Sequence, residues 1–458
     1  MVKEPGPGDA MPFAPAGTAA RPTIDPPWPP PSEAWLALTG FCIAAILSYT
    51  DRQILSLLVD PLRLAFRLSD TQIGILQGVA FAVIYAFAGL PLGRMADVLP
   101  RRRVIIGGIL VWSLATFWCG LAQSFTELFL ARALVGIGEA ALAPAATSMI
   151  ADYFPPRRRG TATGVFLMGQ VAGSGVAIML GGTILQIAQS GALVGWPIVG
   201  TLAPWRATLL VLAIPGLVVA ALIAATREPP RRHSPDRREI LPLREVAMTL
   251  MAHRARLGPV YLGMALLSIG DFSLQSWFPA LLSRQFGLSP GMIAAELGPA
   301  AIAGALLGTL GAGFLGDRLV MRGGVAARLP IAAVAALLAT IGAMVMAASS
   351  PGTAIALFVV WLVTSNAAGA IGITAIQELA PAPARGVALA LISFCNILLG
   401  LGVGATTTAM LTDRVFEGSG AVGRSMTVMA LPAAALGAIA FLFAWRAARS
   451  PDRQMGRG

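Results

Sequence analysis

The sequence predicts an all-α membrane protein whose twelve transmembrane helices form two pseudo-symmetric six-helix bundles. The chain has 458 residues, of which 56% are hydrophobic and only 12% are charged, whereas soluble domains carry about 25% charged residues. Apolar stretches of about 20 residues, each long enough to cross a hydrocarbon core of roughly 30 Å, recur along most of the length. Motifs of the first half also recur in the second half in the same order. These observations together indicate a duplicated polytopic protein.

The apolar stretches fall into two sets of six, which we assign to bundles at residues 35–226 and 257–447. The first set is predicted as Trp35–Val59, Thr71–Ala96, Val104–Gln123, Leu128–Tyr153, Gly160–Ile187 and Arg206–Ala225. The second set is predicted as Leu257–Leu282, Gly291–Leu315, Ala327–Ala347, Gly352–Leu379, Arg385–Leu411 and Met426–Ala447. A basic linker, residues 227–256, joins the bundles.

The segments outside the spans are predicted to be cytoplasmic. Residues 1–34 are Pro-rich without the apolar core of a signal peptide, and we expect a disordered tail. Residues 448–458 form a second tail. In the linker, Leu241–Ala252 is compatible with a short amphipathic helix lying on the membrane surface.

The net charge of +11 comes from arginines that cluster in alternate loops. These clusters are Arg101–Arg103, Arg157–Arg159, the linker, the loop after the eighth span and the C-terminal tail. Because basic residues concentrate on the cytoplasmic side of a membrane protein, both termini are predicted to be cytoplasmic. The membrane is then the plasma membrane, which in a bacterium is the inner membrane. The arginines do not form one basic face, so we expect no nucleic-acid partner.

Nothing in the sequence is typical of an enzyme. The three cysteines lie within predicted spans without metal or disulfide spacing. No GxxxxGK[ST] phosphate loop is present. We therefore expect no metal, no cofactor other than a proton gradient, no catalytic residues and a monomeric chain.

A repeat with a nearly fixed offset relates the two halves. "LSYTD" at Leu47–Asp51 returns as "LSIGD" at Leu267–Asp271, 220 positions later. Other pairs at offsets of 220 or 226 are Gly93 with Gly313, Asp97 with Asp317, and Asp152 with Glu378. Matches in chain order indicate duplication of a six-helix unit in parallel orientation. Asp271 is followed by Phe272 rather than arginine, so we expect it to be secondary to Asp51.

Charged residues within the spans are the main candidates for function. Asp51 and Arg52 lie in an apolar run, where each charge costs roughly 2.5–3.5 kcal/mol. Arg132 and Glu139 are two turns apart on the fourth span and share one face. A rise of about 1.5 Å per residue places Asp51 and Arg52 at a depth between them. We expect Arg52 to reach Glu139 and Asp51 to reach Arg132, as a proton-coupling site or as a structural ion cluster.

"GRMADVLPRRR", Gly93–Arg103, lies between the second and third spans and resembles the loop signature of the major facilitator superfamily. It departs from that signature at Val98 and Pro100. The predicted cytoplasmic gate comprises residues of this loop, the acid at the end of the fourth span and their counterparts in the second half. These residues are Gly93, Asp97, Arg101, Arg102, Arg103, Asp152, Asp317, Arg318 and Glu378. Gly93 would allow close approach of two helices, and an arginine would reach Asp152. The alternative is that the arginines only fix the topology.

Five motifs together resemble the spinster-like branch of the major facilitator superfamily, including its bacterial members. They are "LSYTDRQILSLL", "LSDTQIGILQG", "GLPLGRMAD", "GIGEA" and "ADYFPPRRRG". The resemblance implies the major facilitator fold and a proton-linked carrier of a lysophospholipid or a lipid similar to sphingosine-1-phosphate. It also implies that Asp51 and Glu139 are the protonation sites and that Arg52 takes part in substrate or charge coupling.

The predicted substrate site lies between the halves. Its candidates are Arg52, Glu139, Tyr85, Gln275, Ser365 and Asn366. One arginine in an apolar cavity suits one phosphate head and an acyl tail. Two other transport functions remain open: organic-anion/proton symport, because "YxDR" also occurs in sugar-acid carriers, and multidrug efflux. A receptor or scaffold that transports nothing is a further alternative.

Overall fold

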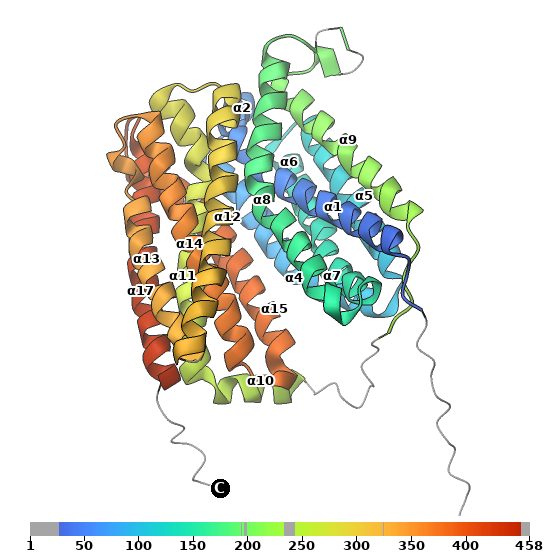
Figure 1. The fold of residues 1–458 in the computed structure, drawn as a ribbon. Helices are drawn as coiled ribbons and strands as arrows, with labels where there is room; N and C mark the ends of the chain where they lie inside the picture. Colours follow the sequence, from blue (N-terminus) through green and yellow to red (C-terminus); the bar gives the residue numbers. More distant parts are fainter. Residues whose placement is uncertain (1–26, 194, 197–198, 233–242, 324, 450–458) are drawn as a thin grey trace, which may run out of the picture.

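The computed structural model describes residues 27–193, 195–196, 199–232, 243–323 and 325–449 (Figure 1). Their regular structure is helical, and twelve helical segments are long and apolar enough to cross a membrane. The predicted fold class is therefore confirmed. The expected tails fall mostly outside the described residues, as does the middle of the linker, while the expected amphipathic segment is helix α10 (Leu243–Ala252).

The first bundle contains six spans, each within a few residues of its predicted bounds. They are α1 (Pro31–Leu57), α3 with α4 (Asp70–Gln77 and Val79–Val98), α5 (Arg101–Leu121), α6 with α7 (Phe125–Ala140 and Leu142–Tyr153), α8 (Pro156–Gln189) and α9 (Pro204–Ala225). The short helices α2 (Val59–Phe66) and η1 (Val199–Thr201) lie in its loops.

The second bundle repeats this order. Its spans are α11 (Arg254–Phe286), α12 (Pro290–Gly323), α13 (Leu329–Gly342), α14 (Pro351–Leu379), the continuous series α15, η5 and α16 (Arg385–Cys395, Asn396–Ala405 and Thr406–Arg414), and α17 (Ala421–Arg449). Short turns η2 (Val325–Arg328), η3 (Val345–Ala347) and η4 (Ala382–Ala384) lie at helix ends.

Proline explains two helix breaks that the sequence analysis did not place. A proline nitrogen cannot donate to the carbonyl four residues earlier, and its ring clashes with that carbonyl. Pro61 therefore separates α1 from α2 near Leu58, and Pro144 separates α6 from α7 at Ala141. The first span therefore ends at Leu57, two residues before its predicted end at Val59.

Helix caps repeat between the bundles. The Ser124 side chain accepts from the backbone N–H of Glu127 at the start of α6, and Ser350 accepts from Thr353 at the start of α14. Both serines are N-caps, which stabilise a helix by pairing a backbone donor that has no partner within the helix. Ser124 and Ser350 are 226 positions apart, so the duplication seen in the sequence extends to local structure.

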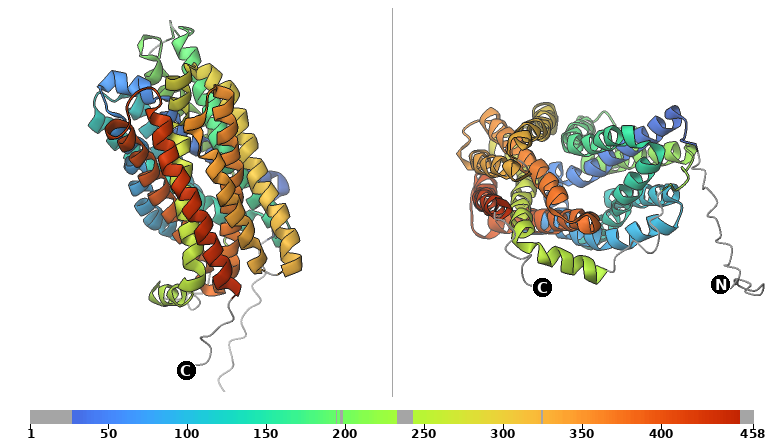
Figure 2. Two further views of the ribbon diagram at one scale, coloured as in Figure 1. Left: turned by 90° about the vertical axis from the view of Figure 1, so that its left-hand side faces the viewer. Right: turned by 60° about the horizontal axis from the view of Figure 1, so that its bottom comes forward.

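The bundles meet at one end and diverge at the other (Figure 1). We call the end that carries the first residues of α1, the last residues of α17 and helix α10 the termini side, and the opposite end the far side (Figure 1 and Figure 2). Inter-bundle packing joins α8 to α12, α3 to α16, α4 to η5 and α1 to α11. On the termini side, Gly93 and Gly313 have open space where a Cβ would stand. The structure is thus closed on the far side, and the close helix approach expected at Gly93 is absent in this state.

Candidate functional site

Four charged side chains of the first bundle come together inside it. Asp51 and Arg52 lie on α1, while Arg132 and Glu139 lie on α6. Their exposed fractions are 4%, 7%, 2% and 1%, respectively. Charges buried this deeply in a membrane protein face the bundle interior and need partners.

Arg52 and Glu139 form the expected ion pair. Arg52 Nη2 lies 2.8 Å from Glu139 Oε2, and the Ser48 hydroxyl donates to the same oxygen at 2.7 Å. Hydrogen bonds between ionised groups are roughly twice as strong as neutral ones. Glu139 Oε1 has no protein partner. The carboxylate thus binds α1 through one oxygen and keeps the other available.

Arg132 reaches Asp51 differently from our prediction. Its Nη1 donates to the backbone carbonyl of Asp51 at 2.9 Å, and not to the carboxylate. Asp51 Oδ1 is buried without a protein partner. Depth along two helices indicates which residues lie at the same level. It does not determine in which direction around the helix axis each side chain points. The expected carboxylate pair is therefore wrong for this state.

Aromatic rings enclose the Arg52 guanidinium. Its central carbon lies 4.9 Å from the ring centroid of Tyr49, 4.7 Å from that of Phe81 and 5.3 Å from that of Tyr85. The face of an aromatic ring attracts a cation at such distances. Tyr85 was among the expected polar candidates, whereas Tyr49 and Phe81 were missed. Tyr49 precedes Arg52 by three residues, and this spacing on one helix face could have identified it.

Two glycines of α6 bring this cluster together. A Cβ at Gly136 would lie 3.0 Å from the carbonyl oxygen of Phe81 on α4, and one at Gly138 would lie 2.6 Å from the backbone nitrogen of Trp112 on α5. Neither distance is compatible with a larger residue at unchanged packing. The glycines thus let α6 approach α5 and also α4, which carries Phe81 and Tyr85.

The second bundle contributes a less charged wall. The Trp361 indole N–H of α14 donates to Asp271 Oδ1 of α11 at 2.7 Å, and the buried Ser365 hydroxyl on the same helix has no protein partner. Gln53 Nε2 of α1 donates to Gln275 Oε1 at 3.3 Å, across the two bundles. Gln53 was missed by the sequence analysis.

Asn366, a predicted residue of the substrate site, pairs with its own helix in this state. Its amide donates at 2.8 Å to the carbonyl of Leu362, one turn earlier on the same helix. An asparagine can pair with its own helix backbone in this way, so its presence in a span does not by itself indicate a binding group.

The arginine cluster of the first bundle forms the expected contact with Asp152. Arg101 is 1% exposed and pairs with Asp152 on α7 and, at 3.4 Å, with Glu228. Arg102 donates to the carbonyls of Ala224 and Thr226 instead, and Arg103 is exposed. These contacts lie within the first bundle and its continuation into the linker.

The remaining predicted gate residues are arranged differently from expectation. The Asp97 side chain is exposed, and Arg231 donates to its backbone carbonyl. Glu378 pairs at 2.8 Å with Arg328, whereas Arg318 lies over the Phe314 ring. The Asp317 side chain lies outside the described residues. A role of these groups in a gate stays a prediction for a state that is closed on the termini side.

Comparison with known proteins agrees with this architecture. The profile of the Major Facilitator Superfamily matches residues 41–405. A protein of Mycolicibacterium smegmatis named as an MFS-type efflux pump is 29% identical over 420 residues, which cover 90% of this chain and 93% of that protein. Human protein spinster homolog 1 is 27% identical over 263 residues, covering 56% of this chain and 47% of that protein.

A solved structure is similar over nearly the whole chain. It is a crystal structure of a bacterial homolog of the human lysosomal transporter spinster in an inward-facing, unoccupied conformation. It aligns with a TM-score of 0.76 and 26% identity, covering 92% of this chain and 98% of that chain. The chain belongs to the Major Facilitator Superfamily, as an integral membrane transporter of the spinster type. These relatives are transporters and not enzymes.

Proposed function

We propose that this protein is a secondary active, proton-coupled transporter of an amphipathic lipid, such as a lysophospholipid or a lipid similar to sphingosine-1-phosphate. The observation that carries the proposal is the buried pair of Arg52 and Glu139, enclosed by aromatic rings and flanked by Asp51. The two bundles would expose this site alternately to either side of the membrane.

Proton coupling follows from the exchange of partners at Arg52. An ionised Glu139 holds the guanidinium at 2.8 Å. Protonation of Glu139 removes the negative charge, and Arg52 is then free to bind an anionic group of the substrate. Asp51 has a carboxylate oxygen without a protein partner and would take up a second proton. A proton thus shifts the population of states by its different affinity for each state.

The substrate class follows from the balance of charge and apolar surface. Arg52 supplies one cation for a phosphate head through charge-assisted hydrogen bonds. The facing wall offers weakly polar groups, such as Gln275 and Ser365, among apolar side chains. A long acyl tail would lie along this wall or pass between the diverging helices. A compact sugar acid would need more cationic partners than one arginine.

Efflux of amphipathic drugs is the second candidate function. The rings of Tyr49, Phe81 and Tyr85 favour it, because aromatic faces also bind flat or cationic drugs. The similarity to a mycobacterial efflux pump over most of both chains supports the same candidate.

The orientation is also a proposal. We infer that the termini side is cytoplasmic, from the arginines on that side of the membrane, and that the structure is therefore inward-facing. A membrane-impermeant thiol reagent should label a cysteine at exposed Arg103 only when it has access to the cytoplasm. Labelling of intact cells at this position would contradict the assignment.

Transport into proteoliposomes under an imposed pH gradient tests the proposed function. Fluorescent lysophospholipid, ethidium and a radiolabelled sugar acid are compared as substrates in the same preparation. We expect pH-driven transport of the lysophospholipid that is lost in Glu139→Gln. Transport of ethidium alone would favour drug efflux, and transport of the sugar acid alone would favour anion symport.

A further inference from the structure

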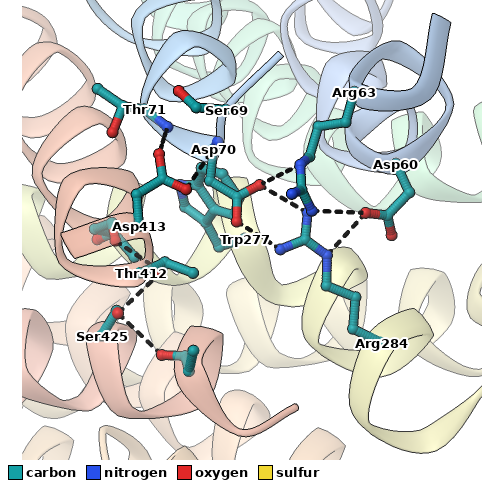
Figure 3. Close-up of polar contacts among 12 residues, drawn as sticks. Asp60, Arg63, Ser69, Asp70, Thr71, Trp277, Arg284, Thr412, Asp413 and Ser425 are labelled. Carbon is teal, nitrogen blue, oxygen red and sulfur yellow. Dashed lines mark hydrogen bonds and ion pairs between the residues drawn. The ribbon is translucent and has the colours of Figure 1, made fainter. Parts of the chain in front are cut away.

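Each bundle supplies a cap for a helix of the other bundle on the far side. The Asp413 carboxylate, at the end of α16, accepts from the backbone N–H groups of Asp70 and Thr71 at 3.1 Å and 2.6 Å (Figure 3). Asp70 and Thr71 form the first turn of α3 in the other bundle. The first N–H groups of a helix have no partner within the helix. Asp413 therefore satisfies two donors that belong to the opposite half of the molecule.

The corresponding helix of the second bundle, α12, is also capped by a side chain of the other bundle, but the capping group is different. Gln186 Oε1, near the end of α8, accepts at 3.1 Å from the backbone N–H of Gly291 in the first turn of α12. Thr71 and Gly291 are 220 positions apart, which is the offset of the repeat. The fifth span of the first bundle thus caps the eighth span, as the eleventh span caps the second. One cap is a carboxylate and the other is a neutral amide.

The difference in charge makes the two caps unequal in strength. The N-terminus of a helix carries partial positive charge and favours an anion over a neutral acceptor. Hydrogen bonds to a carboxylate are roughly twice as strong as neutral ones. Asp413 makes two such bonds, whereas Gln186 makes one neutral bond.

An arginine strengthens the charged cap. Arg284, at the end of α11, places Nη1 and Nη2 each 2.8 Å from the two carboxylate oxygens of Asp70, and Nε 2.8 Å from Asp60 (Figure 3). The Asp70 side chain is 4% exposed. The second bundle therefore holds Asp70 twice, through its backbone by Asp413 and through its side chain by Arg284.

We propose that four residues form a far-side lock, namely Asp60, Asp70, Arg284 and Asp413. The lock sets the fraction of molecules that are closed on the far side. The α3–α16 edge opens only when the charge-assisted bonds of this lock break. The α8–α12 edge, with the neutral Gln186 cap, contributes less to the equilibrium. The lock residues are positioning residues, since they determine which side the buried site faces. This inference goes beyond the proposed function and depends on no particular substrate.

Distance measurements between spin labels test the lock in liposomes without substrate. Labels at Leu64→Cys on α2 and Val415→Cys after α16 use side chains that are 82% and 60% exposed. The native cysteines, Cys42, Cys119 and Cys395, are replaced by serine in this background. We expect one short distance in the closed state and a longer one when the far side opens.

Removal of the charge at Arg284 or at Asp413 should increase the population of molecules with the longer distance between the two spin labels. In Arg284→Gln and Asp413→Asn, the open-to-closed ratio should rise roughly tenfold, as expected for the loss of a hydrogen bond to a charged group. Arg284→Lys keeps the charge without the two-point contact and should give an intermediate ratio. An unchanged distance distribution in both Arg284→Gln and Asp413→Asn would overturn the lock.

Two variants serve as matched controls. Arg63 pairs with Asp70 at 3.2 Å from within the same bundle, so Arg63→Gln should leave the ratio unchanged. Gln186→Ala removes the neutral cap and should change the ratio less than twofold, whereas Gln186→Glu should favour the closed state. If Gln186→Ala opened the far side as much as Asp413→Asn, the proposed asymmetry would be wrong. Loss of the lock would leave the lipid proposal untouched, because no substrate is present.

Discussion

The two bundles share a backbone plan but differ at the positions that carry buried charge. With the offsets of 220 and 226, the residues of the second bundle that correspond to Asp51, Arg52, Arg132 and Glu139 are Asp271, Phe272, Phe358 and Ser365. The spans that hold Arg132 with Glu139 and Phe358 with Ser365 each begin after a serine cap and are 29 residues long. Two arginines and one glutamate are therefore replaced by two phenylalanines and one serine.

Side-chain contacts follow this replacement. Phe358 stacks on Phe278 with ring centroids 4.3 Å apart, where the first bundle has a buried arginine. Asp271 is held by the indole of Trp361 and has no arginine following it. The comparison shows that a six-helix scaffold can be duplicated while most of the charge at these four buried positions is kept in one copy.

The largest effect on transport is expected when one of the two carboxylates of the first bundle is neutralised. Asp51→Asn and Glu139→Gln should each reduce pH-driven transport to background, because neither side chain then changes its charge with pH. Thermal melting in detergent serves to check that both variants are folded. Full proton coupling in the double variant would show that the coupling groups lie elsewhere.

Arg52 should be needed for substrates with a phosphate head. Arg52→Ala removes a charge-assisted contact, so transport of lysophospholipid should fall roughly tenfold or more. Phe272→Ala is the matched change in the second bundle and should have a smaller effect. Equal losses in the two variants would contradict the assignment of head-group binding to the first bundle.

Loss of Arg52 should also lower stability in a way that a second change relieves. Glu139 would be left buried without its cation, and breaking a buried pair costs about 3–5 kcal/mol. The double variant Arg52→Ala with Glu139→Gln should therefore melt at a higher temperature than Arg52→Ala alone. A double variant that melts below the single one would show that the pair contributes little.

The two ion pairs on the termini side differ in solvent exposure, and a smaller difference in stability is expected between their variants. Arg101 and Asp152 have side chains 1% and 7% exposed, whereas Arg328 and Glu378 are 12% and 27% exposed. Because solvent weakens an ion pair, Arg101→Ala should lower the melting temperature more than Arg328→Ala does. The opposite order would mean that local packing, and not burial of the pair, governs stability at this end.

The smallest effect is expected at Asp271. Asp271→Asn keeps an acceptor for the Trp361 indole, and the first bundle retains its carboxylates. Transport should therefore stay within about twofold of the unaltered protein, since one neutral hydrogen bond contributes about 1 kcal/mol or less. Proteoliposome transport at two pH gradients measures this. Damage as severe as that of Asp51→Asn would place proton coupling in both bundles.

Part of the candidate site could be predicted from the sequence alone. Charges in an apolar run are conspicuous, and a two-turn spacing places Arg132 and Glu139 on one face. The pairing of Arg52 with Glu139 was predicted correctly from depth. The contact of Arg132 with a backbone carbonyl was not, because spacing along a helix does not determine the direction of a side chain.

The sequence by itself determined the twelve spans, the duplication and the residues that carry buried charge, since these depend on local hydropathy and repeated motifs. Only the tertiary structure decided which side is closed and what closes it. Asp413 and Asp70 are 343 positions apart, and no periodicity along the chain relates them. Their contact exists because the two bundles meet on the far side, and no single segment of the chain contains both partners of such a contact.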